Sequence, residues 1–452
     1  MIPASRKAAR SAVVAAIATT GLLSASGAFA DVPFGPPSLT PATGTPHLVT
    51  NSATQYVRQL VQCGGTMYAV GTITQIAKGS TKYTRGGAFS FSATSPFKVT
   101  SWDPEVNGTV NTIGFNGTDC SVAYLGGKFT QVGSTTVKNL AAVSTTTGQV
   151  LGSWKNAAGG EVQTIAGWNG HLLVGGKFAG IGGSNAHPYF ASLNPATGKD
   201  DGYLSLGISG NYVFTDDARR SSASNATQVY NQQLSPDGTK DLIEGVFTTV
   251  GGQPRRQVAI IDLNADAAST DAWYAPEFDA NCYVGEPFYA QAGAWAPDGQ
   301  TVYFASTGYK PSNGPAFSTR NARAGLCDAA AAFPTTSGQV SHLWVNYTGC
   351  DSLYAAAADA STAYFAGHER YASNGEGCDG PGRNSVAAPG MVGLSPTDGS
   401  VTYNPTRDRG LGADDLEVTS AGLWVASDNN NGSNMCGHVA NLAGICFLPY
   451  GS

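Results

Sequence analysis

The chain has 452 residues, of which 58 are glycine, about 13% and nearly twice the average share. Charged residues supply only 12% and aromatic residues 10%, which excludes a disordered chain and a coiled coil. The formal net charge is −6, so nucleic acid is not an expected partner. This composition indicates a large folded protein rich in sheets and turns.

Residues 1–30 have the parts of an export signal. A basic start at 6–10 precedes an apolar run at 12–23, and a small-residue cleavage site falls between Ala30 and Asp31. The apolar run is shorter than the ~20 residues that a bilayer span requires, and no later stretch is long enough either. We therefore expect a secreted, extracellular protein with no membrane span.

One phrase, built around Gly-Gly and an aromatic residue, recurs along the rest of the chain. The clear copies are at 124–133, 173–183 and 244–252, and weaker copies are at 69–73, 303–308, 364–368 and 423–427. The Gly-Gly doublets lie inside predicted strands and not between a strand and a helix. They are therefore interpreted as structural and not as a phosphate-binding loop.

Each copy lies in a unit of about 60 residues that reads as four short strands. An apolar run and a turn such as Ser235-Pro236-Asp237-Gly238 come before the copy, and a second apolar run such as 139–143 comes after it. A last short strand ends near an aromatic residue in six of the units. These residues are Trp102, Trp154, Tyr203, Trp273, Trp344 and Tyr403.

Antiparallel four-stranded units without helices predict an all-β fold, a seven-bladed β-propeller. A row of separate small sheets fits poorly, because each sheet has two faces to bury. The chain ends after a third strand at 439–448, and the strand at 47–50 can complete the last blade and close the ring. The expected organisation is a signal peptide at 1–30, an extended lead-in at 31–46 and one propeller at 47–452.

The phrase G-G-K-F-T-x-V-G at 126–133, followed by N-L-A-A-V at 139–143, resembles the secreted bacterial propeller repeats called delta-sixty repeats. The W-x-P at 102–104 fits the same pattern, and the resemblance covers nearly the whole mature chain. The fifth to seventh units depart from the G-G-x-F core. The resemblance implies a propeller but almost no activity, because fold does not fix function.

All eight cysteines follow the signal, and an even count in an exported chain predicts disulfides. None forms a C-x-x-C pair, so zinc and dithiol redox chemistry are not expected. Positions within the repeat favour pairing between sequence neighbours, and for the second pair relatives of the repeat imply the same bond. The expected pairs are Cys63–Cys120, Cys282–Cys327, Cys350–Cys378 and Cys436–Cys446.

Two polar groups are candidate binding sites. Alternation along a strand would place His368 and Arg370 on one face, where they could bind a ligand or form a hydrogen-bond cluster between blades. Asp262, Asn264 and Asp266 offer oxygen atoms at alternate positions, as a calcium loop does. The segment lacks the glycine and the glutamate of that loop, and a solvated turn is the alternative reading.

The sequence contains neither a nucleophile elbow nor a zinc-protease motif, so no catalytic residue and no cofactor is assigned. Two carboxylates facing each other across a propeller mouth could form a glycosidase. The available carboxylates are Asp103, Glu105, Asp414, Asp415 and Glu417. The leading hypothesis is a secreted, non-catalytic propeller that binds an extracellular glycan or an envelope protein. The alternatives are a secreted polysaccharide hydrolase or lyase and a structural module of the cell surface.

Overall fold

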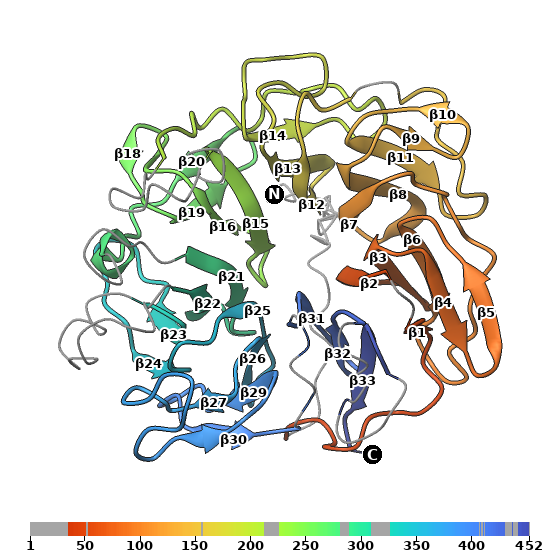
Figure 1. The fold of residues 1–452 in the computed structure, drawn as a ribbon. Helices are drawn as coiled ribbons and strands as arrows, with labels where there is room; N and C mark the ends of the chain where they lie inside the picture. The colour runs from red at the N-terminus through yellow and green to blue at the C-terminus, as the bar shows by residue number, and fades with distance from the viewer. Residues whose placement is uncertain are drawn as a thin grey trace, which may run out of the picture.

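The computed structural model describes residues 35–50, 53–154, 157–211, 226–280, 289–308, 326–405, 407, 410, 412–429, 436 and 442–451. These residues form eleven antiparallel sheets: seven of three or four strands around the centre, which we call the main sheets, and four smaller sheets of two or three short strands. The main sheets follow one another in chain order around a central axis, as in a β-propeller (Figure 1). The all-β prediction is confirmed.

Each main sheet begins with an inner strand next to the axis, and the next strands follow outward in chain order (Figure 1). The inner strands are β2 (Tyr56–Cys63), β7 (Thr109–Asn116), β12 (Val162–Trp168), β15 (Gln228–Leu234), β21 (Tyr289–Trp295), β25 (Leu353–Ala358) and β31 (Asp415–Thr419). The second strands are β3 (Thr66–Thr72), β8 (Asp119–Lys128), β13 (His171–Gly176), β16 (Lys240–Val246), β22 (Thr301–Thr307), β26 (Ala363–Gly367) and β32 (Gly422–Ala426).

The outer part of the sheets is less regular. The third strands are β6 (Ala88–Ser92), β11 (Leu140–Ser144), β14 (Phe190–Leu193), β19 (Val258–Leu263), β23 (Ala329–Pro334), β29 (Met391–Leu394) and β33 (Ile445–Pro449). Fourth strands are present in three sheets as β20 (Ala268–Thr270), β24 (Trp344–Tyr347) and β30 (Val401–Tyr403). In three other sheets a single bridge stands in for the fourth strand, at Val99, Val150 and Asp200. Four full strands in every unit are therefore not seen.

Each smaller sheet is formed by the connection between the second and third strands of a main sheet, and β1 (His47–Leu48) adds a strand to the first of them. The other strands of these sheets are β4 (Gln75–Lys78), β5 (Thr81–Thr84), β9 (Gln131–Val132), β10 (Thr135–Thr136), β17 (Thr249–Val250), β18 (Gln253–Pro254), β27 (Tyr371–Ala372) and β28 (Val386–Ala387). Among the described residues, one short 3-10 helix, η2 (Pro276–Asp279), interrupts the strands.

The Gly-Gly doublets are structural, as the sequence predicts. Gly127 lies in β8, and a Cβ added there would lie 2.1 Å from the carbonyl oxygen of Thr109 on the neighbouring inner strand. The first glycine of the doublet, Gly126, has the next sheet against it, because an added Cβ would lie 2.4 Å from a methyl group of Val162. The doublet therefore lets the second strand approach both its own inner strand and the next sheet.

A second backbone feature repeats at every unit. The residue immediately before each third strand has a positive φ, a backbone conformation that residues other than glycine seldom adopt. These residues are Gly87 (73°), Asn139 (63°), Tyr189 (69°), Gln257 (69°), Asp328 (46°), Gly390 (74°) and Gly444 (80°). The seven units therefore share one backbone geometry although their sequences have drifted apart.

The hydrophobic core is divided into seven clusters, and each cluster fills the space between two consecutive main sheets. One cluster joins the last sheet to the first, where Trp424 and Phe447 pack with Phe91 and Phe97. Both faces of each sheet are buried in this arrangement, which a lone four-stranded sheet could not achieve.

The six aromatic residues that end the units link the sheets through hydrogen bonds. Each donates its side-chain N–H or O–H to a backbone carbonyl in a segment that belongs to the following unit. The donor and acceptor pairs are Trp102–Ser144 (3.1 Å), Trp154–Pro195 (2.9 Å), Tyr203–Asn264 (2.9 Å), Trp273–Pro334 (2.9 Å), Trp344–Pro396 (2.9 Å) and Tyr403–Ser38 (3.1 Å). We call these contacts the aromatic latches.

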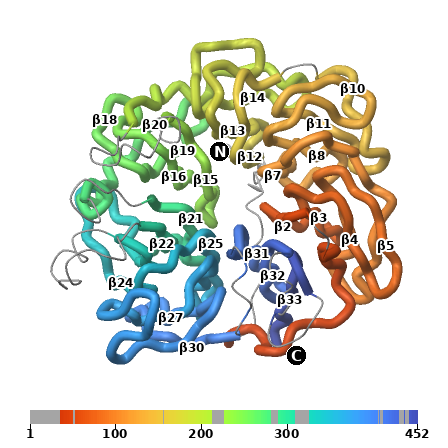
Figure 2. Tube along the Cα trace, in the orientation of Figure 1, coloured from red at the N-terminus to blue at the C-terminus, as the bar shows by residue number. Residues whose placement is uncertain are grey.

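The sixth latch shows how the start of the chain contributes to the last sheet. Its acceptor, Ser38, donates its own N–H to the carbonyl of Pro449 in β33 at 2.7 Å. Ala42 and Leu48 also donate to the backbone beside or within β33, both at 2.8 Å. The beginning of the described chain, drawn in red, thus passes along the last strands, drawn in blue (Figures 1 and 2).

The pairing of residues 47–50 differs from the expectation. His47 and Leu48 form β1, which pairs with β4 in a smaller sheet and not with β33. The segment that lies beside β33 is the proline-rich lead-in, and it donates two separate hydrogen bonds to β33, from Ser38 and Ala42, where a regular strand would make a ladder. Proline has no N–H and cannot donate to a ladder, which explains the interrupted pairing.

We predict that the lead-in stabilises the ring. A chain that begins at Asn51 lacks the three backbone hydrogen bonds and the buried Leu48 side chain. It should therefore melt at a lower temperature than the chain that begins at Asp31. Equal melting temperatures in calorimetry for the two chains would contradict this role.

We also predict that Tyr403→Phe, which removes one latch, lowers the free energy of unfolding by about 1 kcal/mol. Tyr371→Phe is the matched control and should leave the free energy of unfolding unchanged.

Candidate functional site

The seven inner strands surround a central channel with a volume of about 1260 Å³. All seven inner strands contribute side chains to its wall. The wall is mixed in character: β25 supplies the alanines at 355–358, while other strands supply amides, phenols, carboxyl groups and one guanidinium. A cavity of this size and polarity is the main candidate binding site of the described residues.

A ring of side chains lines the channel at the start of the inner strands. In six inner strands the register with the second strand shifts by one residue at the same place, which is a β-bulge. The extra residues, together with Asp414 at the same place before β31, all line the channel. They are Arg58, Asn111, Gln163, Tyr230, Gln291, Tyr354 and Asp414, and we call them the bulge ring.

The residue after the bulge often bonds to the next inner strand. Its side-chain oxygen accepts a hydrogen bond from a backbone N–H of that strand, and this contact joins neighbouring sheets beside the channel. The acceptor and donor pairs are Gln59 with Ile113 (2.8 Å), Thr112 with Ile165 (3.2 Å) and Asp415 with Leu60 (2.8 Å). The last of these pairs joins the seventh sheet to the first through a carboxyl group. The other two junctions use neutral acceptors, an amide and a hydroxyl.

The seventh inner strand carries the densest group of acids in the channel. Burial raises the pKa of Asp414 to about 6, that of Asp415 to about 7 and that of Glu417 to about 8. Arg58 opposes this effect at Asp414, since its guanidinium lies 3.2 Å from the Asp414 carboxylate. Glu417 accepts a hydrogen bond from the backbone of Gln62. Asp415 and Glu417 therefore both bond to the first sheet.

Of the five carboxylates considered from the sequence, the structure brings three together. Asp414, Asp415 and Glu417 line the channel, whereas Asp103 and Glu105 do not. Asp103 accepts hydrogen bonds from the backbone of Gly86 and Glu105 in the connection between the first two sheets. A carboxylate pair made from both groups is therefore not formed at the channel.

His368 and Arg370 lie in the bend between β26 and β27 and not within a strand, so strand alternation does not apply to them. Arg370 forms a two-pronged ion pair with Asp351, with N–O distances of 2.8 and 2.7 Å, and also contacts Asp379. Asp351 raises the pKa of Arg370 further. Ligand binding by the two residues stays a prediction, and the guanidinium already holds two carboxylates.

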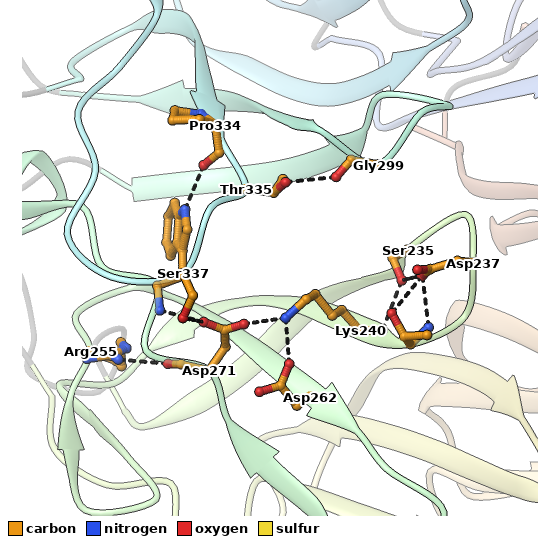
Figure 3. Close-up of polar contacts among 12 residues, drawn as sticks. Ser235, Asp237, Lys240, Arg255, Asp262, Asp271, Gly299, Pro334, Thr335 and Ser337 are labelled. Carbon is orange, nitrogen blue, oxygen red and sulfur yellow. Dashed lines mark hydrogen bonds and ion pairs between the residues drawn. The ribbon is translucent and has the colours of Figure 1, made fainter.

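The oxygen-rich segment at 262–266 is placed on the outer part of the fourth sheet. Asp262 bonds to the ammonium group of Lys240 at 2.5 Å, and Lys240 also contacts Asp271 (Figure 3). Asn264 and Asp266 are exposed in the turn that follows β19. The described residues contain no cluster of three or more His, Cys, Asp or Glu side chains suited to a metal. Calcium binding stays a prediction here.

Three predicted disulfides are present in the structure. Their Cα–Cα distances are 5.7 Å for Cys63–Cys120, 4.7 Å for Cys350–Cys378 and 6.3 Å for Cys436–Cys446. Cys63–Cys120 joins the first main sheet to the second, and Cys350–Cys378 lies beside the Arg370 ion pairs. Cys327 is also disulfide-bonded. Cys282, Ala30 and Asp31 lie outside the described residues.

The bulge ring was not expected from the sequence. A signal was present, because the first strands share a break in alternation, as in Val57-Arg58-Gln59-Leu60 and Val110-Asn111-Thr112-Ile113. The fully buried Glu244, whose carboxyl group lies against Gly293 of the channel wall, was not expected either. Burial holds the pKa of Glu244 well above its usual range.

No family model and no curated protein match the chain. Among solved structures, the chain is similar to the WD40 β-propeller domain of Doa1, with 13% identity and a TM-score of 0.45 over 86% of this chain and 96% of that one. It is also similar to the computationally designed Ika8 protein, with 9% identity and a TM-score of 0.45 over 91% and 99% of the two chains. The fold described above rests on the chain's own sheets.

Within the described ranges, no helix has the length and apolar character that crossing a bilayer requires.

We predict that stability falls as the pH rises from about 5 to about 9. The pKa of Glu417 is about 8 in the folded protein and near 4 in an unfolded chain. The folded state therefore binds more protons between these values, and the stabilisation present at low pH is lost as the pH rises through 8. Asp415, with a pKa of about 7, acts in the same direction.

Glu417→Gln tests this prediction, because an amide keeps the carbonyl acceptor and cannot ionise. The variant should match the parent near pH 5 and melt at a higher temperature near pH 9. Glu105→Gln, at an exposed acid, is the control and should change neither value. A parent and a Glu417→Gln variant that melt alike near pH 9 would show that Glu417 does not titrate in this way.

Non-reducing peptide mapping tests the fourth predicted disulfide. We expect one linked peptide that joins Cys282 to Cys327, alongside the three pairs already described. Cys327 joined to any other cysteine would overturn the assignment.

Proposed function

We propose that the chain is a secreted, seven-bladed propeller that binds an extracellular glycan or envelope protein without catalysing a reaction. Residues 1–30 are its signal peptide, and the lead-in closes the ring against the last blade. Three disulfides are compatible with an oxidising compartment outside the cell. The seven main sheets and the seven equivalent positive-φ residues support the blade number.

The channel is the observation that carries this proposal. Its volume of about 1260 Å³ exceeds that of an ordinary small-molecule pocket. Amides and phenols from several blades converge on it, and such groups provide directional hydrogen bonds. Two of its three clustered acids, Asp415 and Glu417, bond to the backbone of the first sheet. They therefore have a structural role that does not require a reaction.

A secreted hydrolase is the second candidate, and Asp414 is the observation that favours it. Its carboxyl group lies in the channel with a pKa of about 6, near the range of a general acid or base. A glycosidase needs two carboxyl groups on opposite sides of the scissile bond. Asp415 and Glu417 lie on β31 directly after Asp414, and Glu161 of the third unit already accepts a hydrogen bond from Asn111 at 2.9 Å, which supports binding over hydrolysis.

One experiment separates the two functions. The oxidised protein that begins at Asp31 is applied to a glycan array and to envelope extracts, and the bound glycans are assayed for new reducing ends. We expect binding with no new reducing ends. Release that Asp414→Asn abolishes, and the control Asp266→Asn retains, would establish the hydrolase instead. Failure to bind either class of partner would refute the binding function.

A further inference from the structure

Resting on the proposed binding function, we infer that the bulge ring recognises the end of a neutral, hydroxyl-rich glycan that enters the channel. The ring occupies one end of the channel, at the start of the inner strands. The other end is lined by the hairpins that follow these strands, with Gly64, Gly117, Thr118 and Ser235. The bulge ring thus places seven polar side chains at one mouth, while Gln62 and Gln233 line the channel toward the other.

Two amides of the ring are available for a ligand. Gln163 and Gln291 line the channel and are half-buried, and their side-chain amides make no hydrogen bond with other described residues. Each offers an N–H₂ donor and a carbonyl acceptor, which together match a sugar hydroxyl that both donates and accepts. Asn111 differs, because its N–H₂ group bonds to Glu161 at 2.9 Å and to the carbonyl of Val162 at 3.0 Å.

The charges at this mouth exclude an anionic ligand. Among the described residues that line the channel, Arg58 is the one cation, and its guanidinium is paired with Asp414 at 3.2 Å. Glu161 adds a second carboxylate at the same mouth, and Asp415 follows the ring in the seventh blade. A uronate or a phosphate would meet more acids than bases here, which opposes binding. A neutral sugar meets no such repulsion.

Aromatic rings add apolar surfaces against which a sugar can pack. Tyr354 belongs to the bulge ring, and Tyr56 lines the channel nearby, with both side chains half-buried. The Arg58 guanidinium lies over the Tyr56 ring, 4.7 Å from its centre, which fixes the ion pair with Asp414 in place. A sugar presents C–H groups to such rings and hydroxyls to the amides and the ion pair.

The test uses the full mature protein and the neutral oligosaccharides and anionic polysaccharides of the array. Gln163→Met and Gln291→Met together keep the side-chain volume and remove both amides. The double variant should bind neutral oligosaccharides at least about tenfold more weakly, with an unchanged melting temperature. Thr118→Val, at the opposite mouth, is the matched control and should bind as the parent does.

The outcomes distinguish this inference from the function on which it rests. A parent that binds neutral glycans and a double variant that binds equally well would overturn the ring assignment and leave the binding function intact. Parent binding to anionic glycans alone, or to envelope proteins alone, would overturn the ligand class. A parent that binds nothing would refute the proposed function itself. Gln163→Asn with Gln291→Asn, which keeps the amides, should bind better than the methionine pair.

Discussion

In six places around the ring, an aromatic side chain at the end of one unit donates a hydrogen bond to a backbone carbonyl of the next unit, at 2.9 to 3.1 Å. All of these residues are buried, so each bond satisfies a polar group that the packing has removed from water. The latches tie each of the first six units to the segment that follows it, and the inner strands that surround the channel belong to the sheets joined in this way.

The latches explain why the start of the chain matters to its end. The sixth latch, from Tyr403, finds its acceptor at Ser38, and Ser38 is bonded to Pro449 of the last strand. The lead-in thus takes the place that a turn after the third strand has in the other units. Burial of Trp424 and Phe447 against the first sheet completes the junction. The channel wall is continuous across this junction because Asp415 bonds to Leu60.

The sequence predicted the features that repeat. The recurring Gly-Gly doublets and the spacing of Trp102, Trp154 and their equivalents indicated short antiparallel strands in units of about 60 residues. The structure gives both features a physical cause in close backbone approach and in the latches. The lead-in was harder to predict, because its prolines allow isolated hydrogen bonds without a strand pattern.

The candidate site was less accessible to sequence reasoning. The seven members of the bulge ring have five residue types, and a shared register shift places six of them together, with Asp414 at the equivalent place before β31. Asp414, Asp415 and Glu417 were candidates from the sequence, but their role as acceptors for the first sheet needs the ring geometry. Arg370 was selected for its polar neighbours, and the structure shows it paired with Asp351.

A crystal structure of the protein with a neutral oligosaccharide selected on the array would show directly whether the bulge ring binds sugar. We expect sugar density inside the channel, with hydroxyl groups within hydrogen-bond distance of Gln163 and Gln291. Density confined to the outer surface of the ring, with these two amides untouched, would contradict it.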